Sequence, residues 1–286
     1  MSATIVVVVV NFNCGAALAS MLDSLPAGLN GVQWEAVVID NASSDASERT
    51  ALNRERVTLR RGVANVGFAA GVNTGLSTTS APYLLLLNPD CRLEPGSART
   101  LLDELQKHPR CAVIGPRLVD PDGTRQESAR GDPNMLTGLF GRTSLLSRWF
   151  PTLRVVRRNL ASDVTSDGAS TSRRVDWVSG ACMLTRREAL AEVGGFDERY
   201  FLYWEDADLC RRLRHAGWET RYMPGAMAVH DTGQSSRNAR ALANREFHRS
   251  AYRYFATHVV PQWWHPGRAV GWLILMLRRR IKSFER

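Results

Sequence analysis

The sequence is poor in cysteine and lacks the spacing of cysteine-rich metal sites. Its five cysteines are odd in number, scattered and form no Cys-x-x-Cys pair: Cys14, Cys91, Cys111, Cys182 and Cys210. This pattern argues against a disulfide framework and against a zinc site. We expect a reducing compartment, the cytoplasm, and thiols that mostly fill the core.

Long apolar runs are missing as well. The longest unbroken run near the C-terminus covers residues 269–277, whereas a bilayer span needs about 20 residues. The apolar segment 5–10 has no basic region before it and no small-residue cleavage site after it. We therefore expect neither a transmembrane helix nor a signal peptide.

Two common phosphate-binding loops are absent. No Gly-x-Gly-x-x-Gly is found, which disfavours a dinucleotide oxidoreductase, and no Walker A lysine is present. Residues 11–15 follow the first predicted strand without the basic, glycine-rich loop that a sugar nucleotidyltransferase should carry. Composition is that of a globular chain, with 44% hydrophobic and 23% charged residues. The formal net charge of +9 either attracts anions, such as nucleotide diphosphates or lipid head groups, or only keeps the chain soluble.

Strand-like and helix-like segments alternate through the first third of the chain. Predicted strands cover residues 5–10, 34–39, 57–59, 83–87 and 112–114, with helices at 16–25, 47–53, 71–78 and 96–107. This rhythm predicts βαβ units and a mainly parallel sheet. Regularity is lost from 120 to 174 and returns at 175–185, with helices predicted at 186–193 and 205–216 and a short strand at 221–223.

Polar residues follow three of these strands, and each has two interpretations. Residues 40–45 either cap the next helix or present Asp40 to a base or a ribose hydroxyl. Asp90, in the turn Asn88-Pro89-Asp90, is a turn residue or a ligand of Mg²⁺ or Mn²⁺ that bridges diphosphate oxygens. His230 is a structural histidine or a ligand.

Glycines recur every four residues in the segment from Asn65 to Gly75. Gly67, Gly71 and Gly75 either let phosphate approach a helix start or let the helix pack tightly.

Three carboxylates, Glu205, Asp206 and Asp208, begin a strongly predicted helix. Either they only interact favourably with the helix dipole, or one of them is a catalytic base. The dipole should keep such a base ionised at pH 7. The aromatic residues just before them suggest a wall for sugar stacking: Tyr200, Phe201, Tyr203 and Trp204.

The C-terminal tail is aromatic and basic. Trp263, Trp264 and Trp272 precede an apolar run at 273–277 and a basic cluster at 278–282. These features fit an amphipathic helix at a membrane surface, and equally a helix packed on the domain or on a dimer partner.

Taken in order, these motifs resemble the family 2 glycosyltransferases, in particular their rhamnosyltransferase-like branch, over roughly residues 4–235. The matching stretches are 8–13, 38–45, 65–73, 87–90, 177–181, 194–198, 205–212 and His230. The resemblance implies a GT-A fold: an α/β, Rossmann-like, mainly parallel sheet flanked by helices, with a C-terminal helical extension. It divides the chain into a glycosyltransferase domain, 1–235, and a basic aromatic tail, 236–286. Within the domain, 1–119 would form the nucleotide-binding half, 120–174 an irregular insert and 175–235 the acceptor and catalytic half.

The resemblance also implies an inverting, metal-dependent sugar transfer from a dTDP- or UDP-sugar to a glycan or lipid-linked acceptor, as in polysaccharide or cell-wall synthesis, with rhamnose a candidate sugar. Asp206 would be the base, with Glu205 beside it, and Asp90 and His230 would hold Mg²⁺ or Mn²⁺. The family's Asp-x-Asp motif has Asn88 in its first position here. Donor contacts would come from Asn11, Asp40, Asn65, Gly67, Asn73, Asn88 and Asp90, and acceptor contacts from Trp177, Gly180, Tyr203 and Trp204.

Such a displacement needs one base, while the metal stabilises the departing diphosphate, whereas a hydrolase needs a second carboxylic acid. A sugar nucleotidyltransferase and a non-catalytic sugar-binding module stay as alternatives. We expect a cytoplasmic protein, with peripheral attachment to the cytoplasmic face of the inner membrane through the tail as an open option. No nucleic-acid partner is expected, and the oligomeric state is open, a dimer included.

Overall fold

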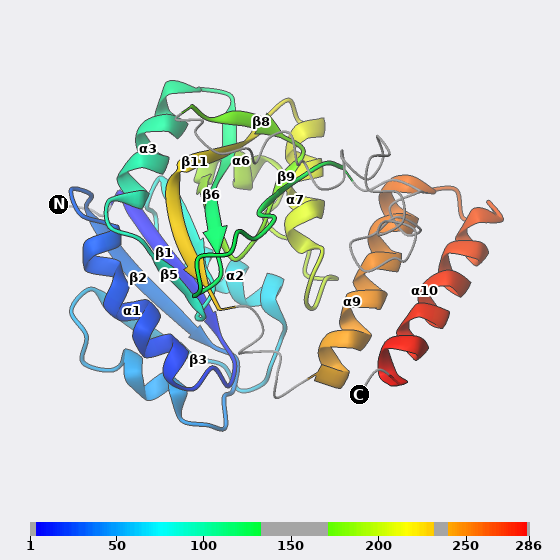
Figure 1. The fold of residues 1–286 in the computed structure, drawn as a ribbon, viewed down its shortest axis with the longest axis horizontal. Helices are drawn as coiled ribbons and strands as arrows, with labels where there is room; N and C mark the ends of the chain where they lie inside the picture. The colour runs from blue at the N-terminus through cyan, green and yellow to red at the C-terminus, as the bar shows by residue number, and fades with distance from the viewer. Residues whose placement is uncertain (1–3, 133–170, 232–239, 285–286) are drawn as a thin grey trace.

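A computed structural model describes residues 4–132, 171–231 and 240–284, and a nine-stranded sheet forms its centre (Figure 1). The strands are β1 (Ile5–Asn11), β2 (Trp34–Asp40), β3 (Val57–Arg61), β4 (Tyr83–Leu87), β5 (Cys91–Leu93), β6 (Cys111–Val119), β8 (Arg173–Val175), β10 (Cys182–Arg186) and β11 (Glu219–His230). β7 (Ala129–Arg130) and β9 (Trp177–Val178) pair separately. The helices are α1 (Ala16–Gly28), α2 (Phe68–Ser77), α3 (Ser97–Lys107), α6 (Arg187–Glu192), α7 (Glu205–His215), α9 (Arg240–Tyr254) and α10 (Gly267–Phe284), with a 3₁₀ turn η1 (Ser47–Ala51) and a π-helical turn η2 (Phe255–Val259).

The sheet is mainly parallel, as predicted. Its strand order is β3-β2-β1-β4-β10-β6-β11-β5, and β8 also pairs with β11. β3, β2, β1 and β4 run parallel, and so do β6 and β11. β10 lies antiparallel between β4 and β6, which reverses the chain direction in the middle of the sheet.

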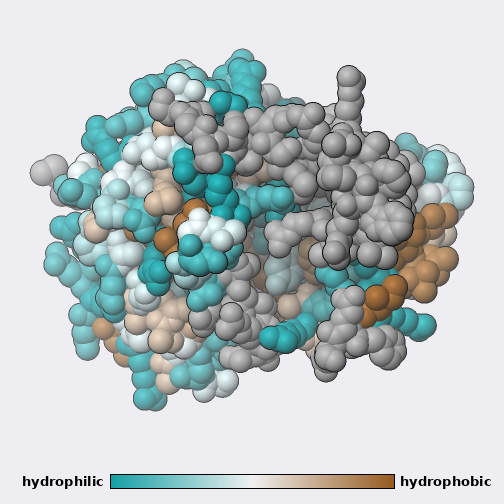
Figure 2. Space-filling view, viewed as in Figure 1, coloured by the Kyte–Doolittle hydropathy of each residue, from teal (hydrophilic) through white to brown (hydrophobic). Residues whose placement is uncertain are grey.

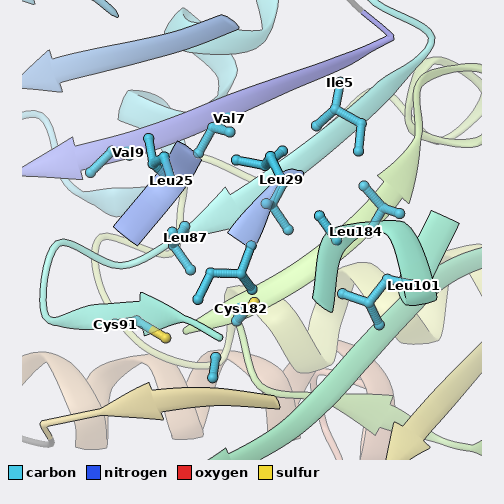
Figure 3. Close-up of a cluster of buried hydrophobic side chains, with 14 of the residues drawn as sticks. Ile5, Val7, Val9, Leu25, Leu29, Leu87, Cys91, Leu101, Cys182 and Leu184 are labelled. Carbon is cyan, nitrogen blue, oxygen red and sulfur yellow. The ribbon is translucent and has the colours of Figure 1, made fainter. Parts of the chain in front are cut away.

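Helices cover both faces of the sheet, and the two faces form separate cores. Val7 and Val9 of β1 join the core on the side of α1 and α3, where Figure 3 shows them close to Leu25. Val8 and Val10 point the other way, into a core with α2, α6 and α7. A strand buried on both faces is continuously apolar, which explains the β-branched run of β1. All five cysteines are buried with free thiols, as expected of core residues.

Two glycines of α2 let this helix lie directly on the sheet. A Cβ atom at Gly75 would lie 2.5 Å from Val8 Cγ1, and one at Gly71 would lie 2.9 Å from Val10 Cγ1. These contacts support the packing interpretation for Gly71 and Gly75.

The structure differs from the predicted elements in several places. Residues 47–51 form a 3₁₀ turn where a helix was expected, and β5, β7 and β8 were not predicted. The short strand expected at 221–223 extends to His230, because an irregularity between Met223 and Met227 accommodates Pro224, which has no N–H to donate. Most of the expected irregular insert, residues 133–170, and the boundary at 235 lie outside the described residues.

The C-terminal extension packs on the domain and not only on itself. α9 covers the aromatic residues before α7: the ring centroids of Trp204 and Tyr254 lie 5.3 Å apart, and those of Trp204 and Phe247 lie 6.0 Å apart. α10 lies beside α9 at the margin of the molecule (Figure 1). Among the residues that the structure describes, no helix has both the length and the apolar character needed to cross a bilayer.

Candidate active site

The parallel strands deliver the predicted donor residues to one edge of the sheet. β1 and β2 end together, with Asn11 opposite Asp40. β4 runs beside β1 in the same direction, with Leu86 opposite Val8, and leads into Asp90. Ligands of parallel sheets bind at this carboxyl edge.

The neighbouring strands bring the remaining residues to the same edge. Because β10 is antiparallel to β4, with Cys182 opposite Leu87, residues 179–181 lie next to residues 88–90. The Asn88 N–H donates to the Ala181 carbonyl over 2.9 Å. β11 pairs with β5 and ends there at His230.

A closed polar network surrounds Asp40. Asp40 Oδ1 accepts from Asn11 Nδ2 at 2.8 Å and from the Ser43 hydroxyl at 2.6 Å, and its Oδ2 accepts from the Ser43 N–H at 3.0 Å. Asn11 Nδ2 also donates to the Ser47 hydroxyl at 2.9 Å, while Asn11 Oδ1 is buried without a hydrogen-bond partner. The network shapes the loop, and with about four acceptor positions on an ionised carboxylate, Asp40 retains capacity for one further donor.

Backbone N–H groups at the start of α2 donate hydrogen bonds to other parts of the protein. The Phe68 N–H donates to the Phe201 carbonyl at 2.7 Å, and the Gly67 N–H donates to Asn65 Oδ1 at 2.9 Å. A Cβ atom at Gly67 would lie 2.6 Å from the Phe201 oxygen, so glycine is needed for this contact. The protein thus engages the first two N–H groups of this helix start, and a donor contact through Gly67 remains a prediction.

Asn73 joins α2 to the loop before α7. Its Nδ2 donates to the Phe196 carbonyl and to Glu198 Oε1, both at 2.9 Å, and its Oδ1 accepts from the Phe196 N–H at 3.0 Å. These bonds hold the loop in place, and a donor contact through Asn73 remains a prediction.

Asp90 and His230 form the candidate metal site. Asp90 Oδ1 lies 3.4 Å from His230 Nε2, and both side chains are largely buried. Gln126 fixes the imidazole: its Nε2 donates to Asp120 Oδ1 at 2.8 Å and to the His230 carbonyl at 2.6 Å. Since both of those partners are acceptors, Gln126 Oε1 must be the atom 2.9 Å from His230 Nδ1, and Nδ1 carries the proton. Nε2 is then the ring nitrogen that faces Asp90.

Asp90 and His230 fit a metal ion that takes its remaining ligands from a substrate. Within the described residues, no group of three or more His, Cys, Asp and Glu side chains could hold a metal ion. A carboxylate and an imidazole are too few for a complete protein cage, but Mg²⁺ usually keeps waters and substrate phosphates as its other ligands. The second ring nitrogen bonded to Gln126 is the usual support of a ligating histidine.

Glu205 and Asp206 open α7, where Glu205 is buried and Asp206 is half-buried. Asp206 Oδ2 accepts from the Gly180 N–H at 2.9 Å and Oδ1 from the Ala207 N–H at 2.8 Å. Burial raises the pKa of Asp206, although these two donors and the charge of Arg130 act to lower it. Burial, with the adjacent Asp206 charge, raises the pKa of Glu205 well above its usual range, and Glu205 Oε2 has no hydrogen-bond partner. Loss of solvation at this position acts against the helix dipole, which favours the ionised form.

The predicted acceptor wall is part of a protein contact. Tyr203 and Trp204 have φ angles of 67° and 72°, a conformation that costs bulky residues about 1–3 kcal/mol each. α9 stabilises them, because the Phe247 ring meets both and the Ser250 hydroxyl donates to the Leu202 carbonyl at 3.0 Å. Their strained backbone positions Glu205 at the start of α7, and their acceptor role stays a prediction.

Trp177 lies near Asp206 in the fold, since β9 packs against α7. Its indole N–H donates to the Gly131 carbonyl at 3.0 Å, and the Arg130 guanidinium lies 5.1 Å from the ring centroid.

Sequence reasoning missed Gln126 and Arg130. Both fall in the stretch that was predicted to be irregular, and only their contacts in the fold single them out.

Residues 6–194 match the sequence model of the family described as Glycosyl transferase family 2. The N-acetylglucosaminyl-diphospho-decaprenol L-rhamnosyltransferase of Mycobacterium tuberculosis (strain ATCC 25618 / H37Rv) is 34% identical over 245 residues, which cover 81% of this chain and 78% of that protein. Rhamnosyltransferase WbbL of Escherichia coli (strain K12) is 42% identical over 82 residues, which cover 29% of this chain and 31% of WbbL.

A solved structure with the same architecture is the mannosyltransferase PcManGT from Pyrobaculum calidifontis in complex with GDP-Man and Mn²⁺. It superposes with a TM-score of 0.61 at 16% identity, over 98% of this chain and 70% of that chain. At this identity the likeness shows the fold, and it confirms the expected GT-A fold.

Proposed function

Because the chain belongs to glycosyl transferase family 2 and is therefore a glycosyltransferase, we propose that it transfers a rhamnosyl group from a nucleotide diphosphate donor with inversion. The donor sugar rests on the two rhamnosyltransferase relatives, and dTDP- and UDP-sugars are the donor classes to test.

In this proposal Asp206 is the general base. The acceptor hydroxyl oxygen attacks the anomeric carbon, the bond to the diphosphate oxygen breaks, and the hydroxyl proton passes to the Asp206 carboxylate. A carboxylate with a raised pKa binds that proton more strongly. Burial and the adjacent Asp206 charge raise the pKa of Glu205, which favours its neutral form, and a neutral Glu205 would donate to an acceptor oxygen.

Asp90 and the Nε2 atom of His230 would hold Mg²⁺ or Mn²⁺, which neutralises the charge that develops on the leaving diphosphate. Asp40 and the buried side-chain oxygen of Asn11 would accept hydrogen bonds from the nucleoside. Donor contacts through Asn65, Gly67 and Asn88 remain predictions.

One observation carries the proposal: a single short segment links the base to the metal site. The Gly180 N–H donates to Asp206 Oδ2, and the next residue, Ala181, accepts from Asn88, two residues before Asp90. Base and candidate metal ligand thus flank the same segment of chain.

The test is turnover of dTDP- and UDP-sugars, rhamnosyl donors included, with and without Mn²⁺, followed through release of nucleoside diphosphate. Asp206→Asn should lower kcat by about 10²–10⁴ while donor affinity persists. Asp90→Asn should weaken donor binding only when Mn²⁺ is present. Asp122→Asn, a fully exposed carboxylate, is the matched control.

Full activity of Asp206→Asn would contradict the proposed role of this residue. Release of pyrophosphate instead would point to a nucleotidyltransferase, and binding of donor without turnover to a sugar-binding module.

We propose that the acceptor is a lipid-linked glycan. The mycobacterial relative is named for a diphospho-decaprenol acceptor, and a lipid acceptor would place the enzyme peripherally on the cytoplasmic face of the inner membrane.

A further inference from the structure

The helix α10 presents its apolar side away from the protein. Val270, Leu273, Leu277 and Ile281 recur at spacings of three and four residues, and their exposed fractions are 57%, 53%, 51% and 60%. Residues at such spacings share one helix face. Figure 2 shows a hydrophobic patch over the α10 side of the molecule. Exposed contiguous apolar surface of this kind marks an interaction site.

The opposite side of α10 is bound to the protein, which fixes the orientation of the helix. A Cβ atom at Gly271 would lie 2.6 Å from Phe255 Cε1, so the helix approaches η2 closely there. Lys282 Nζ lies 5.8 Å from the centroid of the Phe247 ring, and Asn244 Nδ2 donates to the Arg279 carbonyl at 3.3 Å. The apolar face is therefore turned outward by packing on its other side.

Tryptophans extend the outward face at its beginning. Trp263 and Trp264 are 79% and 68% exposed, just before α10. Tryptophan is the residue that favours the boundary between lipid and water, because its ring is apolar and its N–H is polar.

The segment that carries this face is basic. From residue 247 to residue 284 the sequence has no Asp or Glu and seven Lys or Arg residues, of which Arg249 and Arg280 are exposed. Basic residues near an anionic leaflet are attracted to it electrostatically. Two copies of the chain meeting through this face would instead oppose two segments of the same sign.

We propose that the outward face of α10, with Trp263 and Trp264, docks on an anionic lipid surface, with the helix lying in the plane of the interface. This rests on the proposed function in one respect: a lipid-linked acceptor gives membrane docking its purpose. Because α9 contacts both α10 and Trp204, the docked helix would hold the start of α7 at a fixed height above the lipid.

The test is flotation of the full chain with vesicles of phosphatidylglycerol and phosphatidylcholine, compared with pure phosphatidylcholine. We expect flotation on the anionic vesicles, a strong decrease at high salt, and little flotation on pure phosphatidylcholine. The double variant Leu273→Asp with Leu277→Asp should partition at least about tenfold more weakly, since each leucine contributes apolar burial. Leu52→Asp with Val63→Asp, on exposed apolar residues far from α10, should float like the wild type.

Equal flotation of the α10 variant and the wild type would overturn the proposal, and so would wild-type protein that stays in solution. A dimer in sedimentation that the α10 variant loses would assign the face to a second copy instead. Circular dichroism and donor turnover, unchanged in the variant, exclude misfolding. Flotation needs neither donor nor acceptor, so a failure here leaves the proposed transfer untouched, and absent turnover leaves the docking result intact.

Discussion

Replacing His258 by alanine should loosen the C-terminal extension from the helix that carries the base. His258 Nε2 lies 2.6 Å from Asp208 Oδ1, two residues beyond Asp206 on α7. The side chains are 11% and 1% exposed, so the bond is shielded from water. The extension therefore contacts α7 close to its catalytic end, and this contact can be removed alone.

The expected loss can be worked out from these contacts. His258→Ala removes the donor from a buried carboxylate oxygen, while Arg212 Nε keeps its bond to Oδ2 at 2.7 Å. A hydrogen bond to a charged group contributes about 1.5–3 kcal/mol, and the ring contact with Tyr254, at 4.9 Å between centroids, about 0.5–1.5 kcal/mol. The unfolding free energy should fall by about 2–4 kcal/mol, which lowers the melting midpoint by about 4–8 °C.

The assay is thermal denaturation beside donor turnover for four proteins. His215→Ala, an exposed histidine on the same helix, is the control and should melt like the wild type. His258→Gln keeps an N–H donor and should recover part of the loss. Turnover of His258→Ala should fall with stability, because α9 no longer holds Trp204 firmly. An unchanged midpoint for His258→Ala would refute the reasoning that this bond joins extension and domain.

Three further predictions concern the site and its scaffold. Burial raises the pKa of Glu205 in the folded protein. The contribution of Glu205 to stability is therefore present below the pKa that this residue has in the unfolded chain, and it is lost as the pH rises through the pKa of the folded state. Urea denaturation should show that Glu205→Gln stabilises the protein more at pH 8 than at pH 5. Turnover of this variant should fall at least about tenfold. If the unfolding free energies of wild type and variant changed with pH in parallel, this prediction would be wrong. Gln126→Leu should weaken Mn²⁺ binding, read by electron paramagnetic resonance, by about 10–100-fold through loss of the His230 support, and an unchanged affinity would remove Gln126 from the site. Gly75→Ala should cost about 1–3 kcal/mol of stability because its methyl group meets Val8, whereas Thr74→Ala on the exposed side of α2 should cost less.

The sequence alone determined the architecture and the edge where the site lies. The β-branched run of β1 and the alternation of strands and helices predict a parallel sheet, because backbone periodicity is encoded over a few neighbouring residues. Once strands are parallel, the positions of Asp40 and Asp90 after their strands place both at one edge. These conclusions needed no knowledge of distant contacts.

The chemical state of the site was decided by the tertiary structure. The donor of Asp206 is 26 residues away at Gly180, and the support of His230 is 104 residues away at Gln126. The dipole argument for α7 used only local sequence, so it could not anticipate that packing would bury Glu205 and Asp206 and raise their pKa values. Burial is a property of the assembled chain.

The same reason applies to the C-terminal tail. Its aromatic and basic composition was plain in the sequence, but the sequence left open whether α10 turns its apolar face inward or outward. Packing of α9 against Trp204, and of α10 against α9, decides this, because the face left over after packing is the one that meets solvent or lipid.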